Sequence, residues 1–232
     1  MTADDSPTAS LAGWLLGAVG GRFPLADGRV VVAPPWQDGV EAVVVFTGHA
    51  VIATTLPLDA VLAAGADGFG GATLPPLLRL MTGQDGDVEC LDVLLGARGT
   101  GGGRLPQVPA AGTHPRAMHA RHWRTNIRVH GDDRGLLVLA DGVAGLPQIS
   151  YEVPLHLRGR GNGRSLLADG LALVDRNEPV LTAVAPGNAA SLRAVLAAGF
   201  LPLGSVQLVR PSNERRHQTS ETPLTQRPTG PV

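Results

Sequence analysis

The order of the predicted elements after residue 113 constrains the fold more than any other feature of the sequence. Apolar runs bounded by glycine and proline alternate there with segments of helical spacing, in the order strand, strand, helix, strand, helix, strand. The six segments are residues 136–140, 148–153, 165–174, 179–184, 189–198 and 200–210. This order predicts an α/β (α+β) fold with a mixed central sheet flanked by helices.

A separate set of elements is predicted before residue 103. We expect a helix over 8–19 with Ser10 as its N-cap, because two glycines follow it as a stop signal. The other predicted elements are strands over 29–33, 41–46, 50–55 and 88–95 and helices over 58–64 and 74–81. We interpret residues 1–103 as an N-terminal α/β lobe to which the sequence assigns no role.

Composition places a boundary between the two sets of elements. Residues 96–113 lose periodicity and are rich in Gly and Pro, which is typical of a linker or loop, and we set the linker itself at 104–113. Beyond it we expect a domain over 114–210 that opens with a helix over 116–129. Residues 211–232 contain little that can be buried, so we expect a disordered tail there.

Charge and cysteine content exclude several functional classes. The 19 basic and 20 acidic residues nearly cancel, so no net field draws the protein to nucleic acid or to an anionic membrane. The apolar run 11–19 is too short to span a bilayer.

Cys90 is the one cysteine, which excludes an internal disulfide and fits a cytoplasmic location. Its apolar neighbours predict a buried strand thiol.

A loop rich in glycine and arginine follows the strand over 148–153. Residues 158–163 read Arg-Gly-Arg-Gly-Asn-Gly, and a helix comes after them. A helix start carries about four unpaired N–H groups and about half a positive charge, and glycines let an anion approach the backbone. Arg158, Arg160 and Arg164 add donors suited to phosphate oxygens. The loop therefore predicts binding of an acidic ligand such as a pyrophosphate.

Two other nucleotide-binding loops do not fit this segment. The glycines at 159, 161 and 163 lack the G-x-G-x-x-G spacing of a Rossmann loop, and Asp175 follows a helix rather than the end of a strand. A P-loop requires a lysine, and the chain contains none.

A second motif lies downstream of the loop. Residues 186–191, Pro-Gly-Asn-Ala-Ala-Ser, open a helix that ends at Gly199-Phe200. The Arg-x-x-Gly-x-Gly loop, the strand after it and this second motif, in this order and spacing, resemble the GNAT (GCN5-related N-acetyltransferase) family over residues 114–210. The resemblance implies that this part of the chain binds acetyl-CoA, an acyl-CoA, and transfers its acetyl group to an amine.

The resemblance also implies which residues hold acetyl-CoA. The pantetheine arm pairs with the strand edge at 150–153, where a backbone N–H near Val153 or Leu155 polarises the thioester carbonyl. Asn188 and Ser191 contact the cofactor, and Asn188 equally fits a plain helix N-cap. The implied cofactor residues are Val153, Leu155, Arg158, Gly159, Arg160, Gly161, Asn162, Gly163, Arg164, Asn188 and Ser191.

Transfer to an amine needs a base, because the amine must lose a proton before it attacks. Glu152 is the acidic residue on the strand beside the implied thioester, so it is the candidate catalytic base, although strand alternation equally allows it to face solvent. His156 is a weaker candidate. Tyr151 points to the opposite face, toward the core or the cofactor. Val195 stands where the family usually has a tyrosine.

The expected function is that of an acetyl-CoA-dependent N-acetyltransferase acting on an amine of a small molecule or a protein by direct attack on the thioester. The alternative is a non-catalytic acyl-CoA-binding or regulatory, partner-binding protein with a degenerate GNAT domain, which Val195 favours. The N-terminal lobe either completes the same domain or forms its own module. We expect no metal site, because His119 and His122 have no identifiable third ligand.

Overall fold

The computed structural model describes residues 10–109 and 113–215. Its first part contains α1 (Leu11–Val19), β1 (Val30–Ala33), β2 (Glu41–Phe46), β3 (His49–Ala53), α2 (Leu58–Ala63), η1 (Gly71–Thr73), α3 (Pro75–Thr82), β4 (Asp87–Val88) and β5 (Asp92–Arg98). Ser10 caps α1 as predicted, since its side chain accepts a hydrogen bond from the N–H of Gly13. The predicted strand over 88–95 is broken in two at residues 89–91.

The second part contains α4 (Pro115–Trp123), β6 (Thr125–Asp132), β7 (Gly135–Asp141), η3 (Val143–Gly145), β8 (Pro147–Glu152), η4 (Leu155–Leu157), α5 (Asn162–Ala172), β9 (Pro179–Val184), α6 (Ala189–Ala197) and β10 (Leu201–Arg210). The predicted helix over 116–129 is wrong in its second half, where β6 pairs with β7. The reason is alternation, because Ile127 and Val129 pack together under α4 while Arg128 between them is exposed.

The strands form one mixed sheet of ten strands in the order β1-β3-β2-β10-β5-β9-β8-β7-β6, with β4 paired to β10. The pairs β1–β3 and β8–β9 are parallel, and the other neighbours are antiparallel. A mixed sheet flanked by helices confirms the predicted fold class.

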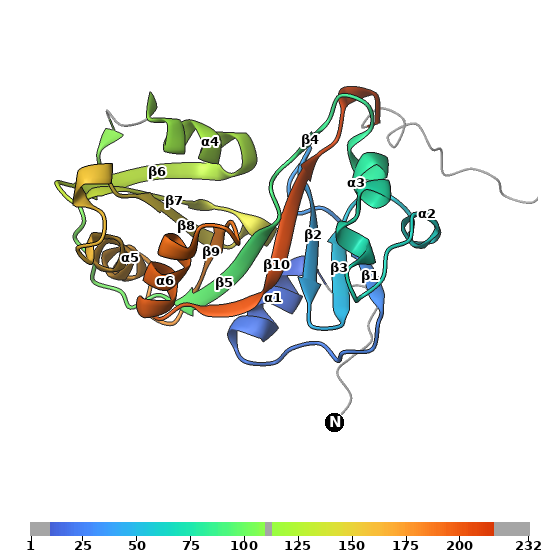
Figure 1. Ribbon diagram of the computed structural model, residues 1–232, viewed down its shortest axis with the longest axis horizontal. Coiled ribbons are helices and arrows are strands. Elements are labelled where there is room, and N and C mark those ends of the chain that lie inside the picture. Colours follow the sequence, from blue (N-terminus) through green and yellow to red (C-terminus); the bar gives the residue numbers. More distant parts are fainter. Residues whose placement is uncertain (1–9, 110–112, 216–232) are drawn as a thin grey trace, which may run out of the picture.

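Strands from the two parts of the sequence interleave in this sheet. β10 lies between β2 and β5, and β5 lies between β10 and β9 (Figure 1). β5 comes from residues 1–103 and yet lies between β10 and β9, two strands from residues 114–210. The predicted division of the chain therefore does not coincide with a division of the sheet.

The predicted linker at 104–113 is held against the sheet over residues 104–109. Leu105 is buried, and the N–H of Val108 donates to the carbonyl of Val129 in β6 at 2.8 Å. These contacts satisfy backbone groups that a free linker would expose to water. Residues 110–112 of the predicted linker lie outside the described residues.

The predicted disordered tail, 211–232, begins with an ordered segment. Ser212 and Arg215 are buried, and the Arg215 guanidinium pairs with the carboxylate of Glu41 at 2.6 Å. Glu41 is itself buried in β2, and a buried carboxylate requires a cationic partner, which orders this part of the chain. Residues 216–232 of the predicted tail, like the start of the predicted helix over 8–19, lie outside the described residues.

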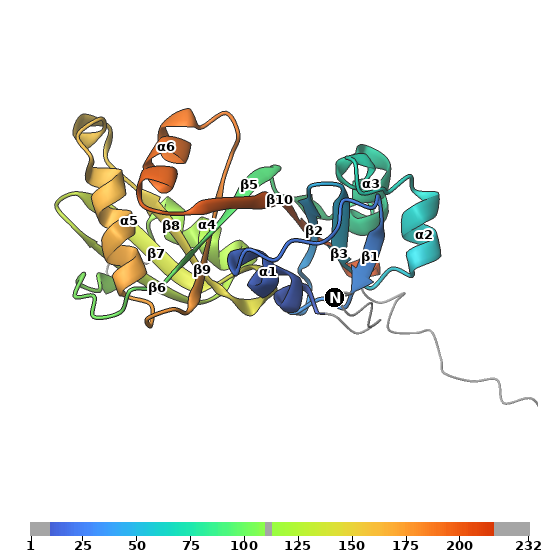
Figure 2. The ribbon, with the colours of Figure 1, turned by 90° about the horizontal axis from the view of Figure 1, so that it is seen from below.

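Helices cover both faces at each end of the sheet (Figures 1 and 2). Around β6, β7 and β8, α4 packs on one face through Ala117 and Ala120, and α5 and α6 pack on the other through Leu166, Leu167 and Val195. Around β1, β2 and β3, α1 lies against one apolar cluster and α2 and α3 lie against another. Within residues 10–109 and 113–215, no helix is long and apolar enough to cross a membrane.

Candidate functional site

The sheet opens between β8 and β9. These parallel neighbours share one register pair, Gln148 with Leu181, and the hydroxyl of Thr182 donates to the carbonyl of Ile149 at 2.9 Å beside it. Toward their C-terminal ends the two strands part, while residues 150–152 stay paired with β7 on their other side. The β8 edge therefore offers backbone groups to an extended ligand that carries amides.

The loop over 158–163 lies directly after this opening. Gly159 and Gly161 adopt left-handed φ angles of 75° and 82°, and a side chain at either position would meet no atom within 4 Å. Both glycines therefore face open space and allow a ligand to approach the backbone closely. The first helical hydrogen bond of α5 runs from Ser165 N to Gly161 O, so the helix begins at Asn162, inside the predicted loop, and presents its first N–H groups there.

The cofactor residues predicted in this loop have different surroundings. Arg158 donates through Nε to the carbonyl of Val153 at 2.9 Å, which fixes the end of β8 relative to the loop. Asn162 donates through Nδ2 to the carbonyl of Leu157 at 2.9 Å. Arg160 and Arg164 are both exposed beside the glycines, so their guanidiniums can reach an anion at the helix start.

Two further predicted residues precede the loop. Val153 is buried, whereas Leu155 is 79% exposed in the η4 turn. His156, the weaker candidate base, is exposed in the same turn. The turn between the end of β8 and the start of α5 therefore exposes Leu155 and His156, while Val153 is packed in the core.

Gly163 marks a close approach between α5, β8 and α6. A Cβ at this position would lie 2.9 Å from Cε2 of Tyr151 and 3.5 Å from Cβ of Ala194. Tyr151 thus packs beneath the first turn of α5, on the core side that the sequence favours for it. Val195 is fully buried in the same cluster, so this position offers no hydroxyl to the opening.

The second predicted motif begins α6. Asn188 is the N-cap, because its side chain accepts a hydrogen bond from Ser191 N at 3.1 Å. This contact fits the helix-cap interpretation of Asn188 and occupies the N–H of Ser191. Since α5 follows β8 and α6 follows β9, and these strands are parallel, both helix starts lie at the end of the sheet where β8 and β9 part.

Glu152 lies on the opposite face of the sheet from Tyr151. Its Oε2 is 3.5 Å from Nε of Arg116 in α4, and both side chains are more than one third exposed. The candidate base is therefore neither free in solvent nor beside the loop, but faces α4.

Further polar residues gather on this face, and the sequence did not predict that they lie together. Together with Glu152 they form what we call the α4-face cluster, which comprises Glu89, Cys90, Asp92, Arg116, His119, Arg124, Ser150 and Glu152. Arg124 donates through Nη1 to Oγ of Ser150 at 3.3 Å. Nε2 of His119 is 3.4 Å from Oε2 of Glu89. α4 and the start of β5 thus place opposite charges beside β8.

The α4-face cluster lies at the open end of the β8–β9 pair. Asp92 begins β5, and its neighbour Val93 pairs with Val184, the last residue of β9. Ser150 and Glu152 stand at the matching end of β8. The opening therefore has the glycine loop on its α5 side and the α4-face cluster on the other side.

Burial changes the acidity of several groups in the cluster. It raises the pKa of the Asp92 carboxyl, an effect that the Cys90 hydrogen bond opposes. It lowers the pKa of Arg124 to about 10, and the charge of Arg116 adds to this effect. A carboxyl with a raised pKa in a polar cluster is a typical acid–base group.

Cys90 is exposed rather than buried in a strand, which corrects the prediction from its apolar neighbours. The chain leaves the ladder between β4 and β5, so the Cys90 thiol turns toward Asp92 and donates to Oδ1 at 3.1 Å. Partial burial of the thiol and the charges of Asp92 and Glu89 raise the pKa of Cys90 to about 12.

Cys90 is therefore expected to react slowly with alkylating agents despite its exposure. The thiolate is the reactive form, and its scarcity outweighs its higher nucleophilicity, so alkylation at pH 8 should be about 10- to 100-fold slower than for an ordinary thiol. Mass spectrometry of iodoacetamide labelling measures this rate, with unfolded protein as the reference. Equal rates in folded and unfolded protein would contradict it.

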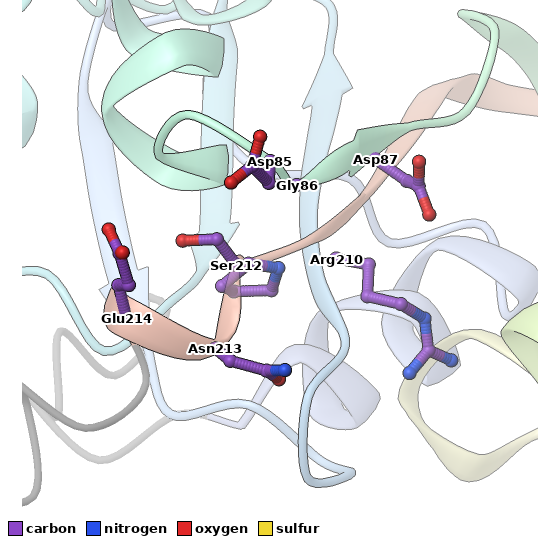
Figure 3. Close-up of a pocket in the computed structure, with 8 residues that line it drawn as sticks. Asp85, Gly86, Asp87, Arg210, Ser212, Asn213 and Glu214 are labelled. Atoms are coloured by element: carbon purple, nitrogen blue, oxygen red, sulfur yellow. The ribbon is translucent and has the colours of Figure 1, made fainter.

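A hollow of about 410 Å³ lies elsewhere, where β4 meets the end of β10 (Figure 3). Its charged lining is Asp85, Asp87, Arg210 and Glu214. The Arg210 guanidinium donates to the carbonyl of His122 and lies 5.8 Å from the centre of the Trp123 ring. This hollow is separate from the glycine loop, so it is not a candidate for the pyrophosphate site.

No family model matches this chain. A comparison with curated proteins also finds no significant match. The assignment of a function therefore rests on the residues and on the geometry described above.

No three His, Cys, Asp or Glu side chains within the described ranges are arranged to hold a metal ion. His119 pairs with Glu89, and Nε2 of His122 is 3.2 Å from Oδ2 of Asp87. The sequence signal for the α4-face cluster was the pair of acids Glu89 and Asp92, which interrupts an otherwise apolar predicted strand.

Proposed function

We propose that the protein is an acetyl-CoA-dependent N-acetyltransferase. The observation that carries this proposal is the opening between parallel strands β8 and β9, directly followed by a glycine loop and a helix start. A CoA thioester has two features that match it, an extended arm with amides and a pyrophosphate. The arm pairs with the edge of β8 at 150–153, and the pyrophosphate binds the first N–H groups of α5 and the guanidiniums of Arg160 and Arg164.

The groups on the two sides of the opening favour acetyl transfer over binding of acetyl-CoA alone. A ligand whose pyrophosphate lies at the α5 start and whose arm enters the opening carries its thioester toward the α4-face cluster. Carboxylates there can accept the proton that an attacking amine loses. We propose a cytoplasmic enzyme whose acceptor is an amine.

A second candidate function is non-catalytic acyl-CoA binding. Val195 favours it, because the buried valine supplies no proton donor where the related family usually has a tyrosine. The two functions differ in one result, since only an enzyme releases free CoA when an acceptor amine is added.

Acetyl-CoA is expected to raise the unfolding midpoint of the protein. A ligand at about 100 times its Kd adds roughly 2.7 kcal/mol, which corresponds to a rise of about 5–10 °C for a protein of this size. Gly161→Glu should lower acetyl-CoA affinity by about 10- to 100-fold, because it places a carboxylate beside the pyrophosphate. Thermal unfolding and calorimetric titration measure both effects.

Gly161→Gln is the matched control, since it imposes the same backbone conformation and nearly the same volume without the charge. The proposal requires Gly161→Gln to bind acetyl-CoA more tightly than Gly161→Glu. Absence of any shift in the wild-type protein would reject both acyl-CoA functions.

A further inference from the structure

Two guanidiniums of the α4-face cluster, those of Arg116 and Arg124, have an enclosed Nε that makes no hydrogen bond to any residue that the structure describes, although Oε2 of Glu152 lies 3.5 Å from Nε of Arg116. The bond that Arg124 does make has a neutral acceptor, the hydroxyl of Ser150. Burial and the charge of Arg116 lower the pKa of Arg124, and the charges of Glu89 and Asp92 oppose this shift only in part. An anion between them would use these donors and offset the repulsion.

Asp92 is the carboxylate of the cluster that can bind a cationic group of a ligand. Its Oδ1 accepts a hydrogen bond from the thiol of Cys90 at 3.1 Å, and a thiol is a weak donor. The Asp92 side chain is half-buried, and burial keeps its pKa raised although the charges of Arg124 and His119 lower it, so a further cationic partner favours its ionised form. An ammonium group is such a partner and has the proton that a base must remove.

We propose that the α4-face cluster is the acceptor site and that the acceptor is a small molecule bearing both an amine and a carboxylate. The carboxylate binds between Arg116 and Arg124, and the amine lies at Asp92. This inference rests on the proposed N-acetyltransferase function. A simple amine would leave Nε of Arg124 without an acceptor among the described residues, whereas an amino acid offers a carboxylate to the guanidiniums and an amine to Asp92.

The transfer step balances with these groups. The acceptor ammonium gives one proton to Asp92, and the free amine forms a C–N bond to the thioester carbon as the C–S bond breaks. The second amine proton goes to the departing sulfur through solvent, which yields an amide and free CoA. Asp92 then returns its proton to water.

Asp92 suits the role of base better than Glu152 does. Glu152 faces the guanidinium of Arg116 at 3.5 Å, and this contact engages its carboxylate in positioning Arg116. Asp92 has no ion pair within the described ranges at a comparable distance. Glu152 is therefore a positioning residue in this site, and Asp92 is the catalytic residue.

The test compares matched acceptors after acetyl-CoA binding has been established by thermal unfolding. Release of free CoA is measured with the common α-amino acids, with β-alanine and γ-aminobutyrate, and with the carboxamide of each. We expect the acids to exceed their carboxamides in kcat/KM by about 10- to 100-fold, as for loss of a charge-assisted hydrogen bond. Arg124→Gln should bring this ratio close to one through KM while the acetyl-CoA shift persists.

Arg116→Gln provides the same readout on a more exposed side chain if Arg124→Gln does not fold. Carboxamides or plain amines that are turned over as fast as the acids would overturn the inference and leave the proposed function standing. A protein that binds acetyl-CoA and acetylates none of these acids would also overturn it. Failure to bind acetyl-CoA would reject the proposed function itself.

Discussion

Replacing Asp92 by asparagine is expected to slow acetyl transfer by about 10²- to 10⁴-fold, the usual contribution of a general base. The loss should appear in kcat, because the asparagine side chain keeps an oxygen for the Cys90 thiol but cannot accept a proton. Acetyl-CoA binding should be unchanged, since the glycine loop lies on the other side of the opening. Steady-state CoA release and calorimetric titration measure the two quantities.

The free energy of unfolding of Asp92→Asn shows whether a lower rate comes from loss of the base or from damage to the fold. Burial raises the pKa of Asp92 in the folded protein above the value of about 3.9 in an unfolded chain. The stability that this carboxyl contributes is therefore present below that value and is lost as pH rises through the raised pKa. The neutral amide avoids this loss, so the variant should be at least as stable as the wild type at pH 7.

The pH dependence of the wild-type rate gives a further readout of the same prediction. Activity should rise with pH through the raised pKa of Asp92, because the base acts in its ionised form. Glu152→Gln should retain this acidic limb. If Glu152→Gln removes the limb while Asp92→Asn keeps it, Glu152 is the base and Asp92 is not.

Removing the carboxylate of Glu41 is expected to destabilise the protein by about 3–5 kcal/mol, because the buried Arg215 guanidinium loses the anion that compensates its charge. Glu41 accepts hydrogen bonds from Thr54, Thr55 and Arg215. Glu41→Ala therefore breaks a network as well as an ion pair. The free energy of unfolding in urea measures the loss, which corresponds to a fall in Tm of about 10 °C.

The control for this prediction is the pair of variants Arg215→Met and Glu41→Met with Arg215→Met. The single variant leaves a buried carboxylate without its cation, so it should be strongly destabilised. The double variant removes both charges and should recover part of the loss, since an apolar pair of similar volume often replaces a buried ion pair at little cost. If the double variant loses as much free energy of unfolding as the two single variants together, the two side chains do not interact.

Local patterns predict most of the elements, and tertiary contacts explain the errors. The hairpin at 41–55 and the helices α5 and α6 follow from periodicity and from glycine positions. The helix predicted to 129 fails because Ile127 and Val129 are two residues apart and face α4 in a strand. The predicted tail contains Arg215, whose burial depends on Glu41 far away in the sequence, so no local pattern could indicate it.

The glycine loop is visible in the sequence because all its parts are contiguous. The α4-face cluster is not, since Asp92 and Glu89 come from the first part of the chain, Arg116 and Arg124 from α4 and the residue after it, and Glu152 from β8. These segments meet because β5 enters the sheet beside β9. That insertion depends on strand order, which hydrophobic periodicity does not encode.

The position of β10 has a consequence for synthesis of the protein. This strand is made after all the other described strands and yet lies between β2 and β5, both of which are made earlier. Until the ribosome has released it, two apolar strands on the nascent chain lack their central neighbour, and such unpaired edges favour aggregation. We therefore expect this sheet to form only after residue 210 has left the ribosome, slowly because its contacts are distant in sequence, and to depend on chaperones until then.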